Sequence, residues 1–197
     1  ADTGHPGPMI QLYHFALSPF CRKVRLVLAE KKLDVELIDE RYWEASSEFL
    51  RRNAAGKVPV LRIDGLTLSD SGAICEYLEE TNSSPMLMPR DPAHRAEVRR
   101  LVAWFDDKFH HEVTSKLVYE RVNKKLTRAG YPDGANVKDG VKAIKFHLDY
   151  MGWLLDRSRW LAGPDLTVAD FAAAAHLSCL DSSSDVDWGR NQAVRDW

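Results

Sequence analysis

The stretch Ser18-Pro19-Phe20-Cys21 decides how the first part of this chain folds. It follows an apolar run at residues 9–15, which is typical of a strand, and it opens a basic amphipathic segment at 22–32, which is typical of a helix. A strand that turns into a helix here places Ser18 at the helix N-terminus. Backbone N–H groups at that end stabilise negative charge, such as a thiolate or an alkoxide.

A strand that enters a helix through such a motif is typical of the thioredoxin-like fold. A dithiol redox protein of that fold would carry its attacking cysteine where this chain has Ser18, and its resolving cysteine at Cys21. The sequence therefore argues against dithiol redox chemistry. Two interpretations of Ser18 remain: it stabilises a bound thiol, or it only caps the helix, as a serine before a helix commonly does.

Composition bounds the class of protein. The chain has 197 residues, of which 45% are hydrophobic and 28% charged, so it can form one large or two small globular domains. A net charge of -2 gives no global basicity for binding nucleic acid. The three cysteines, Cys21, Cys75 and Cys179, are far apart, which predicts reduced core thiols in a cytoplasmic protein.

The start of the chain is left out of the predicted fold. Residues 1–8 are expected to form a flexible tail. No apolar run approaches the roughly 20 residues that span a bilayer, so no membrane insertion is expected.

Strand and helix patterns alternate over the first 80 residues or so. Strands are expected at 10–15, 35–38, 58–63 and 66–68, and helices at 19–32, 46–53 and 72–80. Asp64-Gly65 is a two-residue hairpin turn. The order βαβαββα predicts a thioredoxin-like domain at 9–82.

The pattern changes after a linker at 83–92 that is rich in Pro and Ser. Residues 93–197 are expected to be all helical, with one long helix from about 93 toward Arg128 and a second carrying Val141, Ile144, Leu148, Met151 and Leu155 on one face. Thr167 and Asp170 form a capping box before an Ala-rich helix, and residues 191–197 start another. The fold class is α+β: a thioredoxin-like domain followed by an all-α domain.

Three motifs in this order resemble the glutathione S-transferase superfamily: 18–25 (SPFCRKVR), 56–60 (GKVPV) and 69–74 (SDSGAI). The resemblance implies that Pro59 follows a cis peptide bond, that Val58 pairs with the backbone of glutathione, and that Ser18 donates a hydrogen bond to its thiolate. Asp70 and Ser71 would hold the γ-glutamyl end. The glutathione groove would consist of Ser18, Lys57, Val58, Pro59, Asp70 and Ser71.

The second domain resembles a narrower family, the FtsZ-localised cell-division proteins of bacteria, through residues 96–106, 160–163, 170–178 and 185–188. That resemblance implies a non-catalytic adaptor with no cofactor, in which Ser18 is vestigial. The adaptor would form a homodimer, bind FtsZ filaments and bundle or curve them at the division site. Family domains are expected to continue beyond the position of Trp197 with a further helix and a basic tail. The polar run Ser182-Ser183-Ser184 stands where an apolar residue is expected.

Partner contacts are expected on a loop and on a helix. Arg41 and Trp43 lie between the second strand and a short helix, where aromatic and charged residues are typical of an interface. Trp43 could instead fold back over the edge of the core. Arg95 and Arg99, with the basic residues further along their helix, would steer the chain toward an acidic protein surface, although a charge run usually marks a solvated face.

The histidines suggest no metal site. His110 and His111 are adjacent on a helix and point apart, and His14, His147 and His176 are interpreted as structural. The leading hypothesis is thus the filament-binding adaptor. The alternative is a cytosolic Ser-type glutathione transferase that uses glutathione for conjugation or isomerisation, and a third class is a chaperone-like or ribosome-associated module.

Overall fold

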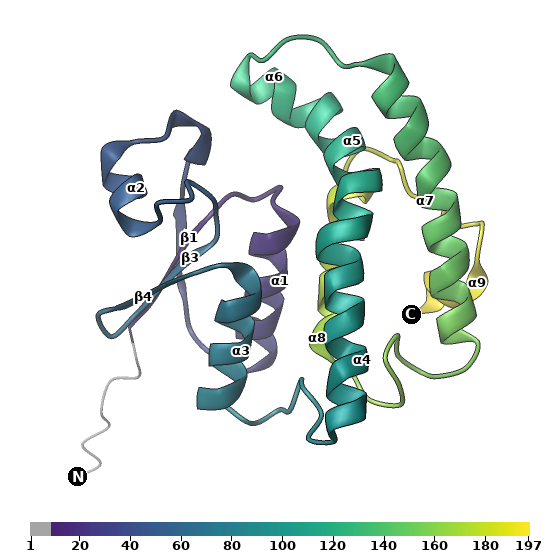
Figure 1. The fold of residues 1–197 in the computed structure, drawn as a ribbon, viewed down its shortest axis with the longest axis horizontal. Helices are drawn as coiled ribbons and strands as arrows, with labels where there is room; N and C mark the ends of the chain where they lie inside the picture. Colours follow the sequence, from purple (N-terminus) through teal and green to yellow (C-terminus); the bar gives the residue numbers. More distant parts are fainter. Residues whose placement is uncertain (1–8) are drawn as a thin grey trace. The chain divides into compact units, whose positions relative to one another are not determined.

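The computed structural model describes residues 9–197, and the predicted tail at 1–8 lies outside the described residues. The chain divides into two compact units, Ala1–Pro85 and Met86–Trp197 (Figure 1). The division falls inside the segment expected to be a linker.

The first unit has the predicted βαβαββα order. Its elements are β1 (Ile10–His14), α1 (Pro19–Glu30), β2 (Glu36–Asp39), a 3-10 helix (Tyr42–Glu44), α2 (Ser47–Arg52), β3 (Val60–Ile63), β4 (Leu66–Ser69) and α3 (Ser71–Thr81). The sheet order is β2-β1-β3-β4; β2 runs parallel to β1, and the other neighbours are antiparallel.

The two faces of this sheet are covered by different helices. Tyr13 and Val60 form a buried cluster with Phe49 of α2. Because successive side chains of a strand point to opposite faces, the fully buried Leu12 and Leu61 face the other side. Figure 1 shows α1 and α3 on that side and α2 on the first.

Local turn chemistry shapes the ends of these elements. Asp64 and Gly65 have positive φ angles of 47° and 87°, which is the backbone of a tight two-residue hairpin, so the predicted hairpin is confirmed. The buried Lys31, after α1, forms an ion pair of 2.7 Å with Glu79 of α3, and its amine donates to the Pro85 carbonyl at 2.9 Å. These contacts tie the end of the unit to α1.

The second unit is helical throughout. Its elements are α4 (Pro92–Ala103), a π-helical segment (Trp104–Thr114), α5 (Ser115–Val118), a second π-helical segment (Tyr119–Asn123), α6 (Lys124–Thr127), α7 (Gly134–Leu155), α8 (Val168–Asp181) and α9 (Gln192–Asp196). The long helix predicted toward Arg128 is confirmed, and it ends where Arg128 takes a left-handed φ of 55°.

The wide π-helical turns inside that helix were not predicted, and their cause lies in the spacing of its buried residues. Five fully buried side chains recur at every fourth position: Leu101, Phe105, Phe109, Val113 and Leu117. An α-helix turns about 100° per residue, so a four-residue repeat drifts by about 40° at each step. Over the whole run the drift would be about 160°, and wider turns keep the row facing one core.

The predicted stripe of α7 is wrong at its first position, Val141. Val141 is 39% exposed and Leu155 is only half-buried, whereas Gly140 and Leu154 are buried. The reason is a close helix contact: a Cβ atom on Gly140 would lie 2.8 Å from Leu117 Cγ. Only glycine lets α7 approach α5 this closely, and the buried face follows from that approach.

The Ala-rich helix α8 is buried along most of its length, which fits its predicted place at the centre of the second core. The serines after it have local partners. Ser182 Oγ donates to the Cys179 carbonyl at 2.6 Å and Ser183 Oγ to the Leu180 carbonyl at 3.0 Å. This polar run therefore satisfies the end of α8. Within residues 9–197, no helix has the length and apolar character needed to cross a membrane.

Candidate functional site

Ser18 lies at the N-terminus of α1, as predicted. Its hydroxyl oxygen accepts a hydrogen bond from the Cys21 N–H at 3.2 Å, and its side chain is nearly buried. Ser18 therefore caps the helix whatever else it does. The helix cap expected at Ser18 is therefore present, and the thiol-binding role of Ser18 stays a prediction.

Cys21 is a packing residue. Its side chain is fully buried, and its sulfur accepts a hydrogen bond from the Phe15 N–H at 3.5 Å. Burial raises the pKa of the Cys21 thiol, and the hydrogen bond from Ser18 opposes that shift only in part. The thiol therefore stays protonated at neutral pH. Cys75 and Cys179 are buried as well, as predicted for core residues.

Strand register brings the three predicted groove segments to one end of the sheet. Tyr13 pairs with Val60, and Val60 pairs with Ser69. Beyond this row the chain continues from β1 toward Ser18 and from β4 into Asp70, while Val58 enters β3 from the same end. Three segments that are far apart in sequence thus leave the sheet together.

The Val58–Pro59 segment has the predicted backbone. The peptide bond between these residues is cis, and Val58 is half-buried while Pro59 is buried. The preceding Lys57 is exposed, and its carbonyl accepts a hydrogen bond from the Asn53 side-chain amide at 2.8 Å. Pairing of Val58 with the backbone of a bound peptide stays a prediction.

Asp70 is the N-cap of α3 and has an unusual backbone. Its φ is 75°, in the left-handed region that non-glycine residues seldom adopt outside functional or tightly constrained positions. Its Oδ1 accepts hydrogen bonds from the N–H groups of Gly72 and Ala73 at 2.8 and 3.1 Å. Two N–H groups at this terminus are thus already taken, and the adjacent Ser71 is buried. Binding of a γ-glutamyl group by Asp70 and Ser71 stays a prediction.

Trp43 lies in a small aromatic cluster. The expected loop is a short 3-10 helix, Tyr42–Glu44, and this is a correction. The Trp43 ring meets Phe15 edge-on at 5.4 Å between ring centroids and Tyr42 at 5.3 Å. It is half-buried, so it both folds onto the edge of the core and keeps an accessible side. Arg41 is exposed and pairs with Glu44 at 3.3 Å.

The basic residues of the long helix are largely engaged. Arg95 is half-buried and donates to the Pro89 carbonyl at 3.2 Å, and Arg99 is exposed. Arg100 binds Glu97 in a bidentate pair at 2.7 and 2.8 Å. Arg121 and Lys124 each form an ion pair of 2.6 Å, with Asp185 and Glu120 respectively. These pairs reduce the positive charge that the helix offers a partner.

The capping box is present as predicted. The Thr167 and Asp170 side chains each accept from the other's backbone at the start of α8. This pair is structural.

His147 belongs to a buried network that was not predicted. The Trp104 indole N–H donates to His147 Nδ1 at 3.1 Å, and His147 Nε2 lies 2.8 Å from a Glu112 carboxylate oxygen. Burial lowers the pKa of His147, so the imidazole is neutral and Nε2–H donates to Glu112. Within residues 9–197 no group of three or more His, Cys, Asp or Glu side chains is placed to hold a metal ion.

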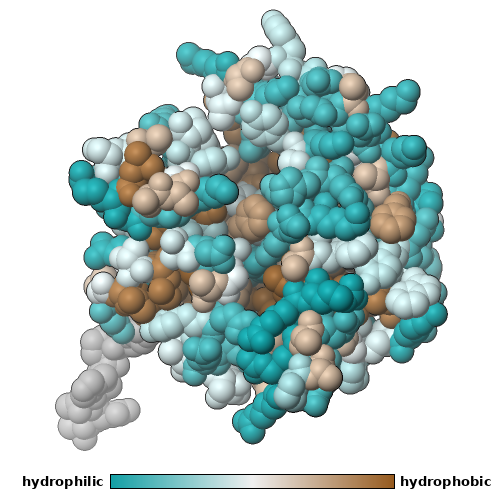
Figure 2. Space-filling model, in the orientation of Figure 1, coloured by the Kyte–Doolittle hydropathy of each residue, from teal (hydrophilic) through white to brown (hydrophobic). Residues whose placement is uncertain are grey.

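An exposed aromatic row on α7 was also missed. Phe146 and Trp153 are 56% and 50% exposed. Tyr150 stacks on Trp153 at 6.0 Å between ring centroids, and its ring lies tilted against Trp104 at 4.6 Å. The spacing of four and three residues from Phe146 to Trp153 was a readable signal. On the face seen in Figure 2 most of the surface is hydrophilic, and hydrophobic residues form small separate patches.

The fold and the groove elements define a glutathione S-transferase-type protein. Residues 12–86 match the family described as "Glutathione S-transferase, N-terminal domain". A crystal structure of a glutathione S-transferase from Rhodospirillum rubrum superposes with a TM-score of 0.94 at 50% identity, covering 96% of this chain and 86% of the other.

A narrower relationship extends over both units. FtsZ-localized protein A of Caulobacter vibrioides is 46% identical over 190 residues, which are 94% of this chain and 83% of that protein. The structure titled FzlA from C. crescentus superposes with a TM-score of 0.92 at 45% identity, covering 96% of this chain and 85% of the other. The chain belongs to the FtsZ-localized protein A family within the glutathione S-transferase superfamily.

Proposed function

We propose that this protein is a non-catalytic transferase-fold adaptor that binds FtsZ filaments and bundles or curves them during bacterial cell division. The observation that carries the proposal is the 46% identity to FtsZ-localized protein A over 94% of the chain. The similarity includes the helical unit, so it exceeds what a shared thioredoxin-like domain would give. The protein would act in the cytoplasm, at the division site.

The filament contact is assigned to Trp43 and Arg41. Trp43 is held by Phe15 and Tyr42, so little side-chain entropy is lost when its accessible side meets a partner. The neighbouring Arg41 is exposed and can exchange Glu44 for an acidic group on FtsZ. Arg99, exposed on α4, and the half-buried Arg95 supply electrostatic attraction.

Bundling requires two filament-binding faces, which a homodimer supplies by symmetry. The exposed aromatic row of Phe146, Tyr150 and Trp153 supports self-association, because aromatic residues are enriched at interfaces and large apolar side chains seldom gather on a monomer surface.

Co-sedimentation with polymerised FtsZ tests the adaptor. The wild-type protein should pellet with filaments, and Trp43→Ala should pellet several-fold less, since interface aromatics are common hot spots. Tyr131→Ala is the matched control, because Tyr131 is 94% exposed on the other unit. A wild-type protein that stays in the supernatant at low salt would refute filament binding. Equal pelleting of Trp43→Ala would refute only the assigned contact.

The alternative is a Ser-type glutathione transferase, favoured by the glutathione S-transferase from Rhodospirillum rubrum at 50% identity and by the intact groove residues. Ser18 would then stabilise the glutathione thiolate, and the cis Val58–Pro59 segment would align the peptide backbone.

Calorimetry with glutathione and turnover of a chlorinated aromatic substrate decide between the two. A non-catalytic adaptor gives no turnover, and Ser18→Ala leaves its pelleting unchanged. Measurable turnover that is lost in Ser18→Ala would favour the enzyme.

A further inference from the structure

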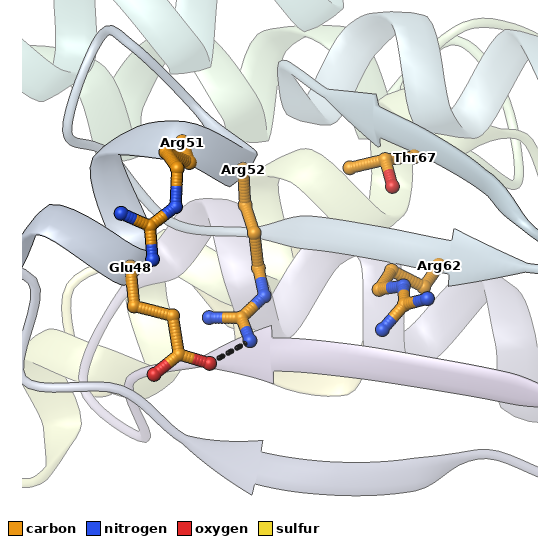
Figure 3. A pocket seen from close by; sticks show the side chains of 5 residues that line it. All are labelled: Glu48, Arg51, Arg52, Arg62 and Thr67. Atoms are coloured by element: carbon orange, nitrogen blue, oxygen red, sulfur yellow. Dashed lines mark hydrogen bonds and ion pairs between the residues drawn. The ribbon is translucent and has the colours of Figure 1, made fainter.

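A basic cavity opens on the first unit, on the face of the sheet that carries α2. Its volume is about 350 Å³, and it is lined by Glu48, Arg51 and Arg52 of α2 and by Arg62 and Thr67 of the sheet. In Figure 3 Arg52 extends from the end of α2 over the sheet to pair with Glu48, Arg62 lies further along the sheet, and Arg51 lies on the helix. Three guanidinium groups and one carboxylate thus line the cavity.

The fold builds this cavity from separate parts of the chain. Arg51 and Arg52 follow Glu48 by three and four residues, so all three lie near one side of a short helix. Arg62 of β3 pairs with Thr67 of β4 and with Gln11 of β1 in strand register. The apolar cluster of Tyr13, Val60 and Phe49 ends beside them, and the polar row continues the same sheet face.

The three arginines are not equivalent. Arg52 is held in place, because its guanidinium pairs with Glu48 and lies 4.5 Å from the centroid of the Tyr13 ring. In the part of the chain that the structure describes, the guanidinium groups of Arg51 and Arg62 form no hydrogen bond or ion pair, and both residues are exposed. The cavity therefore offers two free guanidinium groups on two different elements, with a third fixed between them.

We propose that this cavity binds an acidic peptide segment of a protein partner, with one carboxylate at Arg51 and another at Arg62. Guanidinium groups present paired N–H donors that match a carboxylate. Thr67 adds a hydroxyl at the sheet end of the site. The open, exposed lining suits side chains presented by another protein.

Two features favour separate carboxylates over a phosphate dianion. The Glu48 carboxylate lines the same cavity and repels a concentrated negative charge. Arg51 and Arg52 also stand at the C-terminal end of α2, where the backbone carbonyls carry partial negative charge. Two separate carboxylates of a peptide can each approach one of the two free arginines, and each is repelled less by Glu48 and the end of α2 than a phosphate dianion would be.

The cavity is distinct from the predicted glutathione groove. Arg62 follows Val58 by four residues, about 13 Å along an extended chain. Ser18 and Asp70 begin helices on the opposite face of the sheet, whereas the cavity lies on the α2 face. The inference therefore does not depend on whether glutathione binds.

Fluorescence anisotropy with labelled hexaglutamate tests the site, with hexaglutamine as the uncharged probe. The double variant Arg51→Gln/Arg62→Gln should weaken hexaglutamate binding about fivefold or more, because it removes two exposed ion pairs with the peptide. The variant Lys125→Gln/Arg128→Gln removes the same charge from exposed positions of the second unit and should bind as the wild type does. Glu48→Gln should tighten binding, because it removes the repelling carboxylate.

Several outcomes would overturn the proposal. Equal weakening by the two double variants would show binding through net charge alone. Displacement of hexaglutamate by inorganic pyrophosphate at lower concentration than by unlabelled hexaglutamate would assign the site to phosphate. Unchanged affinity in Glu48→Gln would show that hexaglutamate does not bind beside Glu48, and so not in this cavity. This variant also tests the proposal if the arginine double variant fails to fold.

Discussion

Single buried side chains organise the second unit, and Asp170 is the clearest example. Its Oδ1 accepts hydrogen bonds from the Leu161 N–H at 3.0 Å and the Trp197 indole N–H at 2.9 Å. Its Oδ2 accepts from the Thr167 N–H at 3.0 Å. The capping box was visible in the sequence, but the bonds to Leu161 and Trp197 join segments that only the fold brings together.

Replacing Asp170 should therefore cost more than the loss of a helix cap. Asp170→Ala leaves three donors unsatisfied around a site that is 2% exposed, and we expect the free energy of unfolding to fall by about 3 kcal/mol or more. Thr167→Ala should cost about 1 kcal/mol, the usual value of a cap. Urea unfolding measures both, and equal losses would contradict the wider role of Asp170.

His147 makes stability depend on pH. Burial lowers its pKa below the ordinary value of 6.5, with the hydrogen bond to Glu112 opposing the shift. Below pH 6.5 the unfolded chain therefore binds a proton that the folded chain resists, so the free energy of unfolding falls as pH drops. Above that value this contribution is fully present.

The variant His147→Gln tests this, because glutamine retains a donor and an acceptor but does not titrate. Urea midpoints at pH 7.5, 6.5 and 5.5 (each about one unit apart) should fall less steeply in the variant. A residual slope is expected, since burial also lowers the pKa of His14. An unchanged slope would exclude His147 as the source.

At the scale of elements, the close contact between α7 and α5 depends on a glycine, which has no side chain. Gly140 admits Leu117 so closely that a Cβ atom would lie 2.8 Å from Leu117 Cγ and 3.2 Å from Lys116 Cβ. Sequence periodicity placed Val141 on the buried face instead, because a hydropathy pattern counts apolar side chains and gives glycine no weight. The order and type of the elements, in contrast, followed from turns, caps and alternation within a few residues.

Gly140→Ala should destabilise the second unit by about 1–3 kcal/mol, the range for overpacking in a core. The neighbouring Val141→Ala should change stability by no more than about 0.5 kcal/mol, because Val141 is 39% exposed. Thermal and urea unfolding compare the two. A larger loss in Val141→Ala would contradict the register of α7.

At the scale of the whole molecule, the aromatic row on α7 is the surface on which the proposed homodimer can be tested. The Arg157 guanidinium carbon lies 3.7 Å from the centroid of the Trp153 ring, so a cation–π pair covers one side of this half-exposed ring. Its residues come from one helix, with Trp104 beside them.

The double variant Phe146→Ser/Trp153→Ser should convert the protein to a monomer, which light scattering after size exclusion would measure. Its filament binding should persist while bundling is lost, because one binding face remains. Tyr131→Ser, at a site 94% exposed, is the control. If the wild-type protein is a monomer, or if the double variant stays dimeric, the aromatic row does not mediate self-association.

The sequence by itself determined the element order, the caps and the Ser18 motif, because each depends on interactions within a few residues, whereas the cis Val58–Pro59 bond was expected only from the resemblance to glutathione S-transferases. Ser18-Pro19-Phe20-Cys21 identifies the fold, and its hydroxyl caps α1 with or without a ligand. The tertiary structure alone decided which arginines share a cavity, which histidines have a pKa lowered by burial and where glycine brings helices together. Those features arise between residues far apart in the chain, where packing and burial set the energy and no local pattern records them.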